Sequence, residues 1–121
     1  MENLLYNKAY YEAFLNKLHT PQNGNKFDQI RAWAQARGLY EEGNTETQFV
    51  KLMEETGELA KALLKDSQAN IVDAIGDIVV VLTNLAHMRH VTIETCINEA
   101  YREIENRTGK MINGTFVKDE N

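Results

Sequence analysis

The fold is decided by the stretch ANIVDAIGDIVVVLTNLAHMR, which covers residues 69–89. At about 100° per residue, the apolar side chains of a helix with this sequence cover nearly its whole circumference. A helix that is apolar all round is typically buried, so we expect 69–89 to be the core helix of an all-α protein. The run Val79-Val80-Val81 would also suit a buried strand, because β-branched residues favour strands. About twenty residues without proline exceed the usual strand of about 5–6 residues, which favours the helix.

Three polar residues interrupt this apolar helix along one line. Asp73, Asp77 and Asn84 lie within roughly 40° of one another on the helical wheel. Burying an isolated carboxylate costs several kcal/mol, so two aligned carboxylates need a cation or a shared proton. The alignment therefore predicts a positive partner.

Apolar periodicity predicts helices over about 3–18, 27–37, 45–65 and from 93 to about 108. Gly38 suits the end of the second helix, and Thr45 with Gln48 forms a capping box for the third. Near the C-terminus, Asn113-Gly114 best fits a type I′ turn, which predicts a short β-hairpin or an extended arm, with a frayed terminus as the alternative. We thus expect an all-α bundle of about five helices, completed by oligomerisation, because so few helices scarcely cover 69–89 on all sides.

The helix over 45–65 carries a second acidic group. Glu54, Glu55 and Glu58 lie on one flank, which taken alone is typical of a solvated face. A short turn makes this helix antiparallel to 69–89, and Glu58 and Asp77 then lie about 12–14 Å from the turn. We therefore expect the two acidic groups to meet at one level.

Clustered carboxylates without His or Cys suit Mg²⁺, with Mn²⁺ as the usual substitute. A di-iron bundle requires Glu-x-x-His pairs, and no Glu in the chain is followed three residues later by His. The sequence therefore favours a magnesium site.

Composition indicates a single domain over 1–121, and it limits the partners. The chain has 18 acidic and 13 basic residues and a net charge of -5, which disfavours nucleic acid and anionic membranes as partners. One cysteine, no export signal and no apolar run long enough to span a bilayer favour a cytoplasmic location.

The combined motifs carry a family resemblance. Glu-Glu-Thr-Gly-Glu-Leu at 54–59, Asp-Ala-Ile-Gly-Asp at 73–77 and Asn-Leu-Ala at 84–86 resemble the MazG-like nucleotide pyrophosphohydrolases of the all-α NTP pyrophosphatase superfamily. The resemblance covers about 27–118, including the ending RTGKMINGTFVK at 107–118. It implies hydrolysis of nucleoside triphosphates, often deoxynucleotides, to the monophosphate and pyrophosphate with Mg²⁺. It also implies a homodimer or a dimer of dimers.

The resemblance implies Glu55, Glu58 and Asp77 as metal ligands. The family usually has Glu three residues before this Asp, where this chain has Ala74. Asp73 lies on the helix face of Asp77, and we expect it to replace the missing ligand. Glu54, turned about 100° from Glu55, is the candidate for orienting or deprotonating the attacking water.

Further residues are candidates for binding the substrate. Asn84 would hydrogen-bond the sugar or base, or else be a buried amide satisfied by its neighbours. Trp33 would stack on a base or pack in the core. The positive charges expected to face pyrophosphate are Arg107, Lys110 and Lys118, although each alone also suits a solvated surface.

Two other functions stay open at this level. One is a non-catalytic helical interaction protein with a structural cation site, which Ala74 favours. The other is a relative of the phosphoribosyl-ATP pyrophosphatases, which would ignore common nucleotides.

Overall fold

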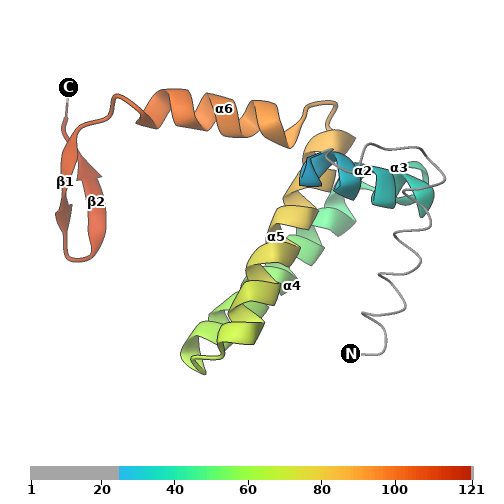
Figure 1. Cartoon of the computed structure of the whole chain (residues 1–121), viewed down its shortest axis with the longest axis horizontal. Coiled ribbons are helices and arrows are strands. Elements are labelled where there is room, and N and C mark those ends of the chain that lie inside the picture. The colour runs from blue at the N-terminus through green and yellow to red at the C-terminus, as the bar shows by residue number, and fades with distance from the viewer. Residues whose placement is uncertain (1–24, 121) are drawn as a thin grey trace.

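A computed structural model describes residues 25–120 and confirms an all-α protein with a C-terminal hairpin (Figure 1). The helix predicted over 3–18 lies outside the described residues. The elements are α2 (Lys26–Ala36), α3 (Leu39–Glu42), α4 (Thr45–Leu64), α5 (Gln68–Met88), α6 (Ile93–Ile104), β1 (Gly109–Ile112) and β2 (Thr115–Lys118).

Side chains cap the helices at their first turns. The Asn25 side chain accepts a hydrogen bond from the Asp28 amide at the start of α2, and Thr92 caps α6 in the same way. At α4 the capping residue is Asn44, whose Oδ1 lies 2.9 Å from the Thr47 amide. The capping box predicted for Thr45 is therefore wrong, because Asn44 supplies the acceptor one residue earlier.

The segment between α2 and α4 is also more ordered than the sequence indicated. Gly38 has a φ of 75°, the left-handed conformation expected at the end of a helix. The short helix α3 occupies Leu39–Glu42, between the two helices predicted over 27–37 and 45–65. Its last turn closes with the Gly43 amide donating to the Leu39 carbonyl over 2.9 Å.

Helices α4 and α5 form a long antiparallel pair that dominates the molecule (Figure 1). The turn between them includes Asp66 at a φ of 52°, and the Ser67 amide donates to the Ala62 carbonyl over 3.0 Å. Ala62 and Ala74 are both buried. Since neither side chain extends beyond Cβ, the two backbones approach closely at this level.

The opposite end of the pair is covered by α2. Ala34 of α2 is completely buried, as is Thr83 of α5, whose hydroxyl donates back to the Val79 carbonyl. Arg31 of α2 contacts Glu94 of α6 through two nitrogen–oxygen distances of 2.8 and 2.7 Å. This end is therefore the best-packed part of the described chain.

Helix α6 leads away from the α4–α5 pair and carries the hairpin at its far end (Figure 1). It ends at Ile104, about four residues earlier than predicted. The reason is that Thr108 already belongs to the hairpin, where its hydroxyl donates to Asp119 and its carbonyl accepts from the Asp119 amide.

The hairpin itself was predicted correctly. Met111 pairs with Phe116 and Ile112 with Thr115 across two antiparallel strands. Asn113 and Gly114 form the turn with φ values of 51° and 82°. Two positive φ values define the type I′ turn that the Asn-Gly pair predicts.

The expected burial of the core helix is only partly correct. Ala74, Val81 and Ala86 of α5 are buried, but Val72 and Ile75 are 62% and 50% exposed. One face of α5 packs on α4 and part of the rest faces outward, because the helices within residues 25–120 are too few to surround it. By length and composition alone α5 is also apolar enough to cross a membrane, a test that core helices of soluble proteins pass as well. Its two aspartates argue against a membrane span, at about 2.5–3.5 kcal/mol for an Asp near the centre of a bilayer.

Candidate acidic pocket between α4 and α5

Acidic side chains from both long helices line one cavity of about 240 Å³. The α4 residues Glu55 and Glu58 approach it from one side and Asp73 of α5 from the other. The remaining lining residues are Lys61, Ala62, Lys65, Asn70 and Ala74. We refer to this cavity as the acidic pocket. It lies toward the α4–α5 turn, since its outermost lining residues flank that turn.

Asp77 lies beside the pocket and is electrostatically coupled to it. Its own burial, the charges of Asp73 and Glu55, and a hydrogen bond with the Glu55 carboxyl together raise the pKa of Asp77 to about 6, although the Lys51 ammonium opposes the rise. Such a shift means that the charged form of Asp77 is disfavoured where it stands. The carboxylates are therefore crowded enough to attract a proton or a cation.

The carboxylates that face each other across α4 and α5 are offset by about one helical turn from the predicted pairs. The sequence placed Glu58 level with Asp77. In the structure Glu58 shares the pocket with Asp73, whereas Glu55 is the α4 carboxylate that acts on Asp77. The difference arises because the turn between the helices is centred near Asp66, which shifts α5 along α4 by about one turn relative to the estimate.

Glu54 and Glu55 differ in exposure although they are neighbours. The Glu54 side chain is 60% exposed and that of Glu55 only 14%. The Lys51 Nζ lies 3.6 Å from a carboxylate oxygen of each. Glu55 thus points into the helix pair, while Glu54 stands at its rim in contact with solvent.

The side chains around the pocket offer oxygen atoms as potential metal ligands. The pocket offers carboxylate oxygens from Glu55, Glu58 and Asp73, with Asp77 adjacent, and no sulfur or imidazole among its lining residues. Hard oxygen ligands of this kind are those that Mg²⁺ and Mn²⁺ prefer. Ala74, at the position where the related pattern has Glu, is 3% exposed and lines the pocket without offering a ligand.

Asn84 is held by a residue that the helical wheel did not reveal. It is only 2% exposed, and its Oδ1 accepts a hydrogen bond from the Tyr40 hydroxyl over 2.6 Å. Burial raises the pKa of Tyr40 to about 12, against the opposing charge of Arg31. This contact agrees with the interpretation of Asn84 as a buried amide satisfied by a neighbour.

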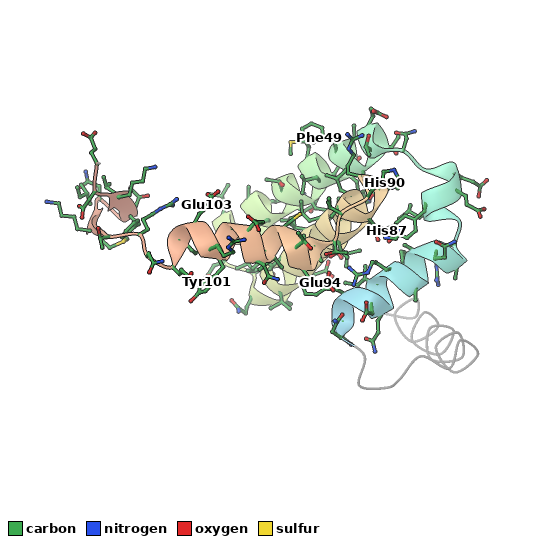
Figure 2. All side chains as sticks on the ribbon, turned by 90° about the horizontal axis from the view of Figure 1, so that it is seen from above. Phe49, His87, His90, Glu94, Tyr101 and Glu103 are labelled. Atoms are coloured by element: carbon green, nitrogen blue, oxygen red, sulfur yellow. The ribbon has the colours of Figure 1, made fainter. Side chains whose placement is uncertain are left out.

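A second cavity of about 260 Å³ lies near this contact, at the other end of α5. Tyr40 and His87 line it with their ring centroids 4.0 Å apart, and His90 and Thr45 also contribute. Figure 2 shows both histidines at the end of α5 near α3. Its lining contains no carboxylate, so it lacks the chemistry of the acidic pocket.

The other substrate-binding candidates lie apart from the acidic pocket. Trp33 is half-buried on α2, and the Arg37 guanidinium lies over its ring at 4.4 Å from the centroid. Arg107, Lys110 and Lys118 are exposed at or within the hairpin, which α6 carries away from the α4–α5 pair (Figure 1). Within one chain, the structure therefore does not bring these three cations to the carboxylates.

Sequence reasoning missed the cations that do line the pocket. Lys61 and Lys65 follow Glu58 at spacings of three and seven residues, which places all three on one stripe of α4. This spacing was the available signal.

The fold and site together define a class: all-α proteins in which two antiparallel helices surround one pocket with carboxylates. Residues 44–112 match the MazG nucleotide pyrophosphohydrolase domain family. Because this match covers more than half of the chain, the chain belongs to that family, whose activity is that of a pyrophosphatase-type hydrolase.

One relative comes from a bacteriophage. The chain is 44% identical over 62 residues to an uncharacterized 18.2 kDa protein encoded in the rep-hol intergenic region of Haemophilus phage HP1 (strain HP1c1). The aligned segment covers 51% of this chain and 38% of the phage protein. No solved structure matches the chain.

Proposed function

We propose that the protein hydrolyses nucleoside or deoxynucleoside triphosphates to the monophosphate and pyrophosphate in a Mg²⁺-dependent reaction. The observation that carries the proposal is the gathering of Glu55, Glu58 and Asp73 around one pocket with Asp77 beside it, where burial and the neighbouring carboxylates raise the pKa of Asp77. Crowded carboxylates repel one another strongly unless a cation offsets their charge. Membership of a nucleotide pyrophosphohydrolase family supplies the substrate class.

In this proposal Glu55, Glu58, Asp73 and Asp77 hold Mg²⁺. Within residues 25–120, no three His, Cys, Asp or Glu side chains stand ready as a preformed ligand group. Glu58 and Asp73 are exposed, so both can rotate toward a common ion. When bound, Mg²⁺ would supply positive charge to the phosphate oxygens and help to orient water.

Glu54 is the proposed acceptor of a proton from the attacking water. Its carboxylate is 60% exposed next to Glu55, where a water has access to it. The water oxygen bonds to a phosphorus of the α–β anhydride, the bond from that phosphorus to the bridging oxygen breaks, and one water proton passes to Glu54. Lys51, which contacts both Glu54 and Glu55, keeps Glu54 close to the ligands.

We also propose that the protein acts as a homodimer or a dimer of dimers in the cytoplasm. Exposed apolar side chains include Phe49, Val50, Met53, Val72, Ile75, Ile97, Tyr101 and Ile104. A second copy of the chain offers matching apolar surface, which makes a symmetric assembly the simplest way to cover these residues.

The function is tested by incubating the purified chain with the common NTPs and dNTPs and Mg²⁺ while pyrophosphate is measured. We expect release from at least one substrate and a loss of about 100-fold or more in Glu58→Gln. Glu46→Gln, which alters an exposed carboxylate on the same helix, is the matched control and keeps full activity. Equal rates in Glu58→Gln, or no release from any nucleotide, would instead support the non-catalytic cation-binding alternative or a phosphoribosyl-ATP substrate.

A further inference from the structure

We propose that Lys61 and Lys65 bind the β- and γ-phosphates of the substrate, and hence the leaving pyrophosphate, at the end of the acidic pocket next to the α4–α5 turn. This inference rests on the proposed function and adds an orientation of the substrate to it. The triphosphate tail points toward the turn, and the nucleoside lies outside the pocket.

The first observation is that both lysines belong to the same cavity as the carboxylates. Lys61 and Lys65 line the acidic pocket with Glu55, Glu58 and Asp73. Their spacing of four residues places the two ammonium groups on adjacent turns of one helix face. The pocket therefore has carboxylates along its length and two cations at one end, an arrangement suited to a metal-bound polyphosphate.

The second observation is that these lysines are not engaged by the carboxylates beside them. In the part of the chain that the structure describes, Lys51, Arg31 and Arg102 form ion pairs with acidic side chains, and neither Lys61 nor Lys65 does so. Lys51 contacts Glu54 and Glu55 and so partly neutralises the other end of the acidic group. The ammonium groups near the turn are the ones left to meet an incoming anion.

The third observation is the size of the pocket. A cavity of about 240 Å³ is smaller than the about 300–1,000 Å³ of pockets that enclose a whole drug-sized ligand. It has room for a phosphate chain, and the remainder of a nucleotide would extend beyond it. Lysine is a compact point charge that suits phosphate oxygens, so the phosphates are the part of the substrate that this end selects.

The order of the carboxylates and lysines along α4 determines the direction in which the triphosphate would lie. Lys65 lies ten residues beyond Glu55, which corresponds to about 15 Å along α4. The reacting anhydride must lie near the carboxylates, and the outer phosphates then extend toward the lysines. Arg107, Lys110 and Lys118 cannot fill this role from within the same chain, because the hairpin lies away from the pocket (Figure 1).

The test is calorimetric binding of inorganic pyrophosphate and of AMP, CMP, GMP and UMP, each with Mg²⁺, to the full chain and its variants. We expect Lys61→Ala and Lys65→Ala each to weaken pyrophosphate binding by about tenfold, the loss of one charge-assisted hydrogen bond. Monophosphate binding stays within about twofold of the wild type, and Lys61→Arg retains most of the pyrophosphate affinity. Lys26→Ala, which removes an exposed lysine of α2, is the matched control and changes neither the pyrophosphate affinity nor the monophosphate affinity.

Unchanged pyrophosphate binding in both alanine variants, or an equal loss for pyrophosphate and monophosphates, would overturn the inference. These outcomes are separate from a failure of the proposed function. If nucleotide hydrolysis is intact while the lysine variants bind pyrophosphate normally, the function stands and the lysine assignment falls. If no nucleotide is hydrolysed, the pyrophosphate titration still decides whether the two lysines bind phosphates.

Discussion

At the scale of single residues, the same polar line on α5 serves two purposes. Asp73 and Asp77 face α4 and its carboxylates, whereas Asn84, two turns beyond Asp77, is buried beside Tyr40. The carboxylates are crowded together, and the amide is satisfied by a hydroxyl. One stripe of a helix therefore supplies carboxylates of the proposed site near the turn and a structural contact at the other end.

The Tyr40–Asn84 contact leads to a prediction about stability. Tyr40→Phe removes the donor to a buried acceptor, so we expect the free energy of unfolding to fall by about 1–2 kcal/mol. Urea denaturation of the full chain measures this change in the free energy of unfolding. Tyr101→Phe, at a tyrosine that is 58% exposed, should change the same quantity by less than about 0.5 kcal/mol. Equal effects of the two substitutions would show that the hydroxyl does not stabilise the core.

At the scale of elements, an ion pair joins α2 to the first turn of α6. The Arg31 guanidinium binds both oxygens of Glu94 and holds the pKa of that carboxyl below its usual value. The unfolded chain therefore takes up a proton at Glu94 at a higher pH than the folded chain does. The stabilisation is complete above the ordinary carboxyl pKa of 4.5 and is lost as the pH falls through the lower, folded value.

This ion pair gives the second prediction. Glu94→Gln should lower the free energy of unfolding by about 1 kcal/mol at pH 7. The difference between the variant and the wild type should shrink as the pH falls below 4.5. Glu99→Gln, which breaks the exposed i,i+3 pair with Arg102, is the matched control with a smaller effect. A difference between Glu94→Gln and the wild type that stays constant with pH would contradict the proposed origin of the stabilisation.

Local signals in the sequence predicted the elements well, because they depend on neighbours in the chain. The apolar period placed α4 and α5, and Asn113-Gly114 placed the hairpin turn. The errors concern helix ends, where two neighbouring residues can both cap the helix or where a residue distant in the sequence determines the last turn. Asn44 took the cap expected of Thr45, and pairing with Asp119 ended α6 early by drawing Thr108 into the hairpin.

The site was predictable in its chemistry but not in its full composition. Spacing on two helices identified the carboxylates, since 3.6-residue periodicity determines which side chains share a face. The register between α4 and α5 depends on the geometry of the turn, so the facing pairs differed by about one turn. Tyr40 lies 44 residues from Asn84 in the chain, and no helical wheel contains that contact.

At the scale of the whole molecule, the excess of acidic over basic residues matches the number of acidic residues in the proposed site. Without Glu54, Glu55, Glu58, Asp73 and Asp77, the chain has as many acidic as basic residues. The net charge of -5 therefore equals the charge that these five carboxylates carry when all are ionised. A net negative charge disfavours extended polyanions as partners, whereas the proposed substrate is a small triphosphate that would bind together with magnesium.

The arrangement of α6 gives a prediction about assembly. Ile97, Tyr101 and Ile104 lie on one face of α6 and are each about half-exposed, and Figure 2 shows Tyr101 and Glu103 on opposite sides of that helix. Light scattering of the full chain should give a mass of two or four times 13.8 kDa. The double variant Ile97→Glu, Ile104→Glu should shift the mass toward the monomer, because it places charges on the apolar face.

Glu103→Gln leaves that face unchanged and is the control for assembly. A monomeric wild-type chain would contradict the proposed dimer. An oligomer that is indifferent to the double variant would show that other apolar residues form the interface.

The most direct test of the central proposal is the identity of the products formed from the best nucleotide substrate, followed by phosphorus NMR with and without Mg²⁺. We predict equimolar monophosphate and pyrophosphate that appear only with the divalent cation and that Glu58→Gln fails to produce. Release of the nucleoside diphosphate and inorganic phosphate would contradict the assignment of the acidic pocket as a magnesium-dependent pyrophosphohydrolase site. Equal turnover in the presence of a chelator would also contradict it.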